Sequence, residues 1–71
     1  MPQLAVKWYK TALESPAVDT ETVLALLYEI GSAYELAGDR DSALQSFLEV
    51  YARNIDYRDV ANRIHSLQQP Q

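Results

Sequence analysis

Residues with the types needed for catalysis or metal binding are few in this chain, and their spacing builds no recognisable site. His65 is the only histidine, and it has no nucleophile or second ligand at site spacing. The acidic residues Glu29, Glu35, Asp39 and Asp41 do not follow the calcium-loop pattern D-x-[DN]-x-[DN]-G. The absence of cysteine excludes disulfides and cysteine-ligated metals. We therefore expect no catalytic residue, no cofactor and no metal, and predict that the protein is not an enzyme.

The net charge of −4 is concentrated in the middle of the chain. Residues 16–52 carry seven acidic side chains and one arginine, a net charge of −6, whereas both ends are slightly basic. Nucleic acids and anionic membranes are bound through basic surfaces, so we expect neither as a ligand. No apolar run approaches the roughly 18 residues of a membrane span, and the N-terminus lacks the apolar region of a signal peptide. These features favour a cytoplasmic protein.

Four helices are predicted from apolar residues at helical spacing and from the capping residues between them. The predicted helices cover residues 2–15, 20–37, 40–53 and about 57–68. Asp19 or Thr20 is the expected N-cap of the second helix, Asp39 or Asp41 of the third, and Asp56 of the fourth. At 71 residues the chain forms a single domain.

The second and third helices carry the pattern Leu27-x2-Ile30-Gly31-x2-Tyr34 followed by Ala43-x3-Phe47. A glycine inside a helix costs about 1 kcal/mol relative to alanine. Gly31 therefore indicates a close approach of the next helix, and we expect Ala43 opposite it. Gly38 is suited to the left-handed residue that ends the second helix. The residues expected on the core face of this helix are Val23, Leu26, Leu27, Ile30, Tyr34 and Ala37.

This pattern resembles the signature of the tetratricopeptide repeat, W-x2-L-G-x2-Y followed by A-x3-F. Leu27 and Ile30 replace the usual Trp and Leu, and Ile55 stands where proline is common. The resemblance, to a bacterial-type fragment of this family, implies an all-α fold of antiparallel helical hairpins. About four helices would form part of a right-handed α-solenoid.

The repeat organisation implied by the resemblance spans the single domain, residues 1–71. Residues 1–15 correspond to a half repeat, 24–57 to a full repeat, and 58–68 to a half repeat or capping helix. In the first half repeat, Ala5-x3-Tyr9 has the spacing of Ala43-x3-Phe47. We expect a fragment of a longer repeat protein; the alternative is a small stand-alone module.

The resemblance also implies a protein–protein interaction module, a scaffold or adaptor. First helices of successive repeats in this family line a groove that holds a peptide or helix of a partner protein. The residues expected to line such a groove are Ala25, Tyr28, Ser32, Glu35, Asp59 and Asn62. Tyr28 is the expected apolar anchor, and the acidic residues favour a basic, partly apolar partner segment. The alternative is that Tyr28 packs on a neighbouring loop or on the fourth helix.

A second interpretation belongs to a different class. In it the chain is a self-assembly element, or an interdomain spacer, and the groove is incidental. Its terminal helices would pair with another copy to form a homodimer, through Leu4 and Trp8 of the first helix or Ile64 and Leu67 of the fourth.

Overall fold

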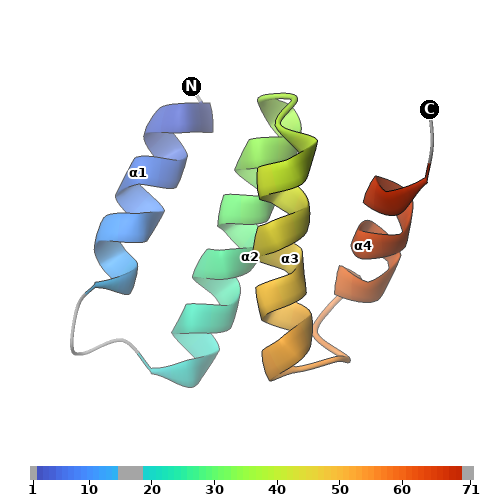
Figure 1. Cartoon of the computed structure of the whole chain (residues 1–71). Helices are drawn as coiled ribbons and strands as arrows, with labels where there is room; N and C mark the ends of the chain where they lie inside the picture. Colours follow the sequence, from blue (N-terminus) through green and yellow to red (C-terminus); the bar gives the residue numbers. More distant parts are fainter. Residues whose placement is uncertain (1, 15–18, 70–71) are drawn as a thin grey trace.

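The computed structural model describes residues 2–14 and 19–69, and in these residues it contains helices and no strand. The helices are α1 (Pro2–Leu13), α2 (Thr20–Leu36), α3 (Arg40–Arg53) and α4 (Val60–Gln68). Each helix packs against the next along the chain, so that α2 contacts both α1 and α3, and α3 also contacts α4 (Figure 1). The predicted all-α class is confirmed. None of the described helices has the length and apolar character needed to cross a membrane.

The ends of α2 and the start of α3 follow the predicted capping residues. The Asp19 carboxylate accepts a hydrogen bond from the Thr22 backbone N–H at 2.8 Å. At the other end Gly38 has φ of 81°, and the backbone N–H of Asp39 donates to the Tyr34 carbonyl oxygen at 2.9 Å. This is the Schellman arrangement, in which a left-handed residue closes the last helical turn. The Asp39 side chain then caps α3 by accepting from the Ser42 N–H at 3.2 Å.

The predicted N-cap of α4 is wrong, because this helix begins later. Asp56 lies in a turn, where its backbone N–H donates to Asn54 Oδ1 at 3.0 Å. Arg58 has φ of 45°, a left-handed conformation that interrupts any helix running through it. Asp59 takes the N-cap position, but its side chain makes no capping hydrogen bond. The first helix also ends earlier than predicted, at Leu13, and residue 15 lies outside the described part of the chain.

The core lies along α2 and α3 and extends to α4. Its centre is formed by Phe47, Val50 and Val60, which are completely buried. Ala43, expected opposite Gly31, is completely buried, but it does not supply the atoms nearest to Gly31. A Cβ atom on Gly31 would instead lie 2.8 Å from the Phe47 ring, so the missing side chain makes room for an aromatic ring.

The buried face of α2 is wider than the single stripe predicted for it. The residues of α2 that are buried are Leu24, Leu27, Tyr28, Ile30, Gly31 and Ala33. Ala37, expected in the core, is exposed. Ile30 and Ala33 join a small cluster with Val6 of α1, whereas Leu24 and Tyr28 belong to the main core shared with α3 and α4. Helix α2 buries more of its surface because it has neighbours on more than one side.

Candidate functional site

The predicted site on α2 and α4 centres on Tyr28, which the structure buries. Its side chain is only 8% exposed, so the expectation of an accessible anchor is wrong. The Tyr28 ring packs edge-on against Phe47 and Tyr57, with ring centroids 5.5 Å and 6.0 Å away. Its hydroxyl donates a hydrogen bond to the Asp59 carboxylate at the start of α4. Tyr28 therefore fastens α4 to the rest of the fold, as in the alternative left open by the sequence.

Arg63 completes what we call the Tyr28 cluster: Tyr28, Glu35, Asp59 and Arg63. Its guanidinium forms an ion pair with Glu35, and Arg63 Nε lies 3.5 Å from Asp59 Oδ2. The same guanidinium lies 5.5 Å from the Tyr28 ring centroid, within the range of a cation–π contact. Both carboxylates expected to attract a basic partner are thus paired inside the molecule.

The ionisation of the Tyr28 cluster reflects these contacts. The hydrogen bond donated by Tyr28, together with the nearby Arg63 charge, holds the pKa of Asp59 below its ordinary value of 3.8. Burial, followed by the hydrogen bond to Asp59, raises the pKa of Tyr28 above its ordinary 10.0. At neutral pH the phenol is therefore protonated and the carboxylate charged, which is the combination that preserves their hydrogen bond.

Three of the predicted site residues, Tyr28, Glu35 and Asp59, are therefore brought together. Ala25 and Ser32 are half-buried on α2, and Asn62 is exposed on α4. The predicted face is closed by its own internal contacts at its centre. The residues at the centre of this face hold α4 in place, so they are not available to bind a partner.

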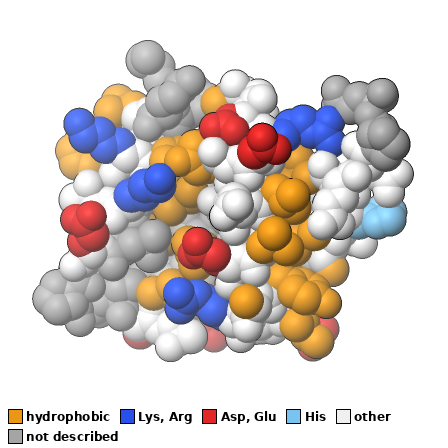
Figure 2. Space-filling view, in the orientation of Figure 1, with side chains coloured by type: hydrophobic (Ala, Val, Ile, Leu, Met, Phe, Trp, Pro, Cys, Tyr) orange, Lys and Arg blue, Asp and Glu red, His pale blue; other side chains and the backbone are white. Residues whose placement is uncertain are grey.

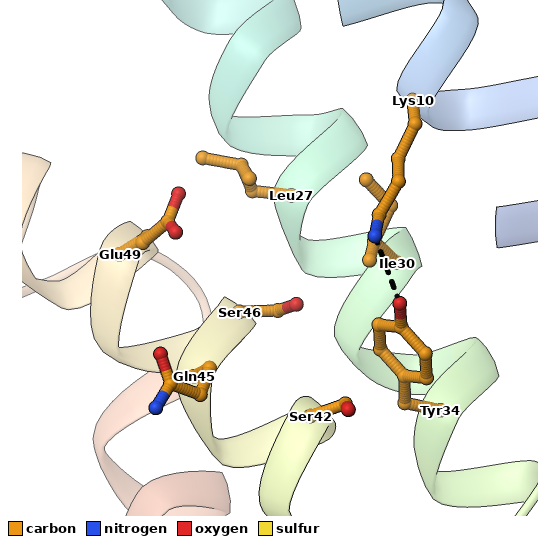
Figure 3. Close-up of a pocket in the computed structure, with 8 residues that line it drawn as sticks. All are labelled: Lys10, Leu27, Ile30, Tyr34, Ser42, Gln45, Ser46 and Glu49. Carbon is orange, nitrogen blue, oxygen red and sulfur yellow. Dashed lines mark hydrogen bonds between the residues drawn. The ribbon is translucent and has the colours of Figure 1, made fainter. Parts of the chain in front are cut away.

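A hollow of about 320 Å³ lies elsewhere, between α1 and α3, and we call it the α1–α3 groove. Its lining residues are Lys10 from α1, Leu27, Ile30 and Tyr34 from α2, and Ser42, Gln45, Ser46 and Glu49 from α3. Figure 3 shows Lys10, Ile30 and Tyr34 on one side of this space and Ser42 and Ser46 on the other. In Figure 2 apolar side chains are visible between α1 and α3, with basic side chains over α1 beside them. The groove therefore has an apolar floor and polar walls.

The walls of the α1–α3 groove differ in shape and charge. Lys10 Nζ donates to the Tyr34 hydroxyl at 2.9 Å and lies 5.5 Å from the centroid of the same ring (Figure 3). On the other wall, Ser42 and Ser46 stand one helical turn apart and extend little into the space. Glu49 supplies a negative charge farther along this wall. The small serines leave room for a ligand, and the opposite charges of Lys10 and Glu49 can orient it.

The site predicted from the sequence does not include this groove, although the residues of its α3 wall form a recognisable pattern. Ser42, Gln45, Ser46 and Glu49 form a polar stripe at i, i+3, i+4 and i+7 on a helix whose other residues include a buried stripe. Such a stripe is normally solvated. Lys10 of α1, which packs on α2, lies across from this stripe and forms an opposite wall that the stripe alone does not predict.

His65 remains without catalytic neighbours among the described residues. It is exposed on α4, and its Nε2 atom lies 3.0 Å from Gln69 Nε2. Across residues 2–14 and 19–69, no group of three or more His, Cys, Asp or Glu side chains is placed to hold a metal ion.

Comparison of the chain with protein-family models, with curated proteins and with solved structures finds no match. The geometry of the molecule is therefore the basis for a functional proposal.

Proposed function

We propose that this protein is a tetratricopeptide-like interaction module that binds a peptide or short helix of another protein in the α1–α3 groove, without catalysis. The observation that supports this most directly is the groove itself. Its volume of about 320 Å³ is at the lower end of the range for ligand sites, and it combines an apolar floor with a few polar groups. Such a surface suits one anchor side chain and the backbone on either side of it.

The repeat-like part of the proposal is supported by the hairpin of α2 and α3. Gly31 and Phe47 occupy matching positions of the tetratricopeptide signature, and they are in close contact. The left-handed Gly38 closes a short turn between the two helices, which a compact hairpin requires.

The chemistry of the groove specifies features of the partner segment. Leu27, Ile30 and Tyr34 offer a floor for one leucine or aromatic side chain. Gln45 and the two serines can exchange hydrogen bonds with the segment's backbone. Glu49 favours a basic residue beside the anchor, in keeping with the acidic middle of the chain. A contact this small should bind weakly, with a Kd on the order of 0.1–1 mM for a short peptide.

A peptide screen monitored by amide NMR shifts tests the proposal. The probes are short blocked peptides in which one Leu, Phe or Trp is followed by Lys, together with scrambled versions lacking the anchor. Binding is expected to shift the amides of Lys10, Tyr34 and the α3 wall, and to weaken as salt is added. Shifts confined to Ser32 and Asn62 would contradict the assignment.

Two matched variants separate the two faces of the molecule. Ser46→Leu should fill the α1–α3 groove and reduce peptide affinity at least tenfold, because the buried serine lies on its wall. Asn62→Leu adds the same side chain to the exposed face of α4 and should leave affinity unchanged. The reverse result would assign the ligand to the α2–α4 face and overturn the proposal.

A further inference from the structure

Both ends of the helix array present apolar side chains. On α1, Leu4 and Trp8 are 51% and 68% exposed, and they line a shallow hollow with Lys7 and Thr11. At the opposite end a hollow of about 190 Å³ lies between α3 and α4. Its lining residues are Leu48, Tyr51, Ala61, Ile64, His65 and Gln68. Figure 2 shows a strip of apolar side chains in this position, between α3 and α4.

The hollow on α1 corresponds, residue by residue, to one wall of the internal α1–α3 groove. Helices α1 and α3 align at an offset of 38 positions, which places Ala5 and Tyr9 over Ala43 and Phe47. At that offset the α3 wall of the groove, Ser42, Gln45, Ser46 and Glu49, aligns with Leu4, Lys7, Trp8 and Thr11. These four residues are the ones that line the α1 hollow.

Four of the six residues that line the hollow between α3 and α4 correspond to the remainder of the same groove. Helices α2 and α4 align at an offset of 34 positions, at which Ile30 corresponds to Ile64. The groove floor of Leu27, Ile30 and Tyr34 then aligns with Ala61, Ile64 and Gln68. Lys10 of the α1 wall aligns with Leu48 at the offset of 38. The internal groove therefore has two halves, the α3 wall and the surface formed by α1 and α2. The exposed face of α1 corresponds to the first half, and the exposed face of α3 and α4 corresponds to the second.

We propose that α1 of a second copy docks, head to tail, on α3 and α4 of the first. Within one copy α1 and α3 both pack on α2. In the proposed contact α4 takes the place of α2, α3 takes the place of α1, and the incoming α1 takes the place of α3. The side chains support this arrangement. Leu4 and Trp8 stand where the internal groove has Ser42 and Ser46, the small residues that leave it open. Leu48 likewise replaces the charged Lys10. Leu4, Trp8 and Leu48 therefore fill the middle of the contact between copies with apolar side chains, while the internal groove stays free for a ligand.

This mode of association has defined consequences. The two surfaces differ, so the contact is heterologous: copies add in series, as an open chain or a closed ring, rather than stopping at a two-fold dimer. One short helix seated on two others makes a small interface, below about 1,200 Å², which is typical of weak complexes. Association should therefore depend on concentration and become measurable at about 0.1 mM and above.

Sedimentation velocity with two complementary variants tests the arrangement. Leu4→Glu with Trp8→Glu blocks the α1 surface, and Leu48→Glu with Ala61→Glu blocks the α3–α4 surface. All four side chains are exposed, and circular dichroism checks that each variant remains helical. The parent chain should form dimers and larger species, and each variant alone should be a monomer. An equimolar mixture should form one-to-one dimers and nothing larger, because each variant retains one usable half.

Trp8 supplies an independent readout, because it is the only tryptophan. In the mixture Trp8 is present only in the variant that carries Leu48→Glu and Ala61→Glu, which we call the α3–α4 variant; the other is the α1 variant. The emission of Trp8 should shift to the blue on mixing, because docking buries the indole ring. The single change Trp8→Ser places at position 8 the residue type found at the aligned position, Ser46. It should weaken self-association at least tenfold. Leu36→Glu replaces a leucine that is 82% exposed but outside both surfaces, and should associate like the parent chain.

Several outcomes would overturn the proposal. If the α1 variant still self-associates, copies pair through some other surface. If the α3–α4 variant still self-associates, then the α1 helices of two copies pair with each other, or α1 is exchanged between copies. A parent chain that stays monomeric at millimolar concentration, or a mixture that forms no dimer, would show that the two half-surfaces do not recognise each other.

Discussion

The ring of Phe47 lies 2.8 Å from the point where Gly31 would carry a Cβ atom. Real Cβ contacts of this length are essentially absent, so a substitution at Gly31 must displace the ring. Phe47 is completely buried and packs against Tyr28, which leaves it little space to move. The contact links the α2–α3 hairpin to the residues that fasten α4.

Gly31→Ala should therefore destabilise the fold, although alanine is the better helix former. The gain in helix propensity is about 1 kcal/mol, whereas overpacking a core typically costs about 1–3 kcal/mol. We expect a net loss in the free energy of unfolding, measured by urea denaturation with circular dichroism. Phe47→Leu should relieve the clash, so the double variant should show positive coupling in a double-mutant cycle. A Gly31→Ala variant more stable than the parent would show that the ring can move aside.

Gly38→Ala should destabilise the fold for a different reason. No atom lies within 4 Å of the added Cβ, but the φ of 81° is strained for any residue with a side chain. The expected cost is about 1–2 kcal/mol, by the same urea measurement. Phe47→Leu should not rescue this variant, which separates backbone strain from side-chain crowding.

Tyr28→Phe should cost about 1 kcal/mol, because the ring packing is kept and the hydrogen bond to Asp59 is lost. It should also change the pH dependence of stability. The pKa of Asp59 is lowered in the folded state, so its stabilising contribution is present above 3.8 and is lost as the pH falls through the lower folded value. In the variants Tyr28→Phe and Asp59→Asn, the decrease in the free energy of unfolding at acidic pH should be smaller than in the parent chain. Asp59 is half-exposed, so solvent screening limits the effect.

The same hydrogen bond should be visible at alkaline pH. The pKa of Tyr28 is raised above 10.0, so the folded state retains the phenolic proton that the unfolded state releases. Stability contributed by Tyr28 is therefore present below pH 10 and declines as the pH rises through the folded pKa. Tyrosine absorbance during alkaline titration should show one phenol titrating later than the others, and Tyr28→Phe should remove it.

Arg40→Ala should loosen the end of α4 without unfolding the rest. The Arg40 guanidinium donates to the carbonyl oxygens of Leu67 and Gln69, at 2.7 Å and 3.0 Å. These carbonyls belong to the last turn of α4 and the residue after it, where helical partners are missing. Amide hydrogen exchange should become faster in the last turn of α4, while α2 and α3 keep their protection. Uniformly faster exchange across all helices would indicate global destabilisation instead.

The sequence by itself determined the helix class, most helix ends and the residues that cap them. Asp19, Gly38 and Asp39 act through hydrogen bonds to backbone groups a few residues away. Such contacts are local, so residue type and spacing are enough to predict them. The start of α4 was the largest exception, because the left-handed Arg58 delays the helix and Asp59 bonds to Tyr28 rather than to its own backbone.

Only the tertiary structure decided which faces are free. Tyr28 was expected on an open surface, but the approach of α4 covers it, and Arg63 pairs with the acids that were expected to bind a partner. Ser42 and Ser46 belong to a polar stripe of a kind that is normally solvated. Lys10 of α1 lies across from them, and the stripe therefore forms one wall of a groove. Helical periodicity specifies the direction in which a side chain points. Its neighbours depend on helices distant in sequence, and their placement is a property of the assembled fold.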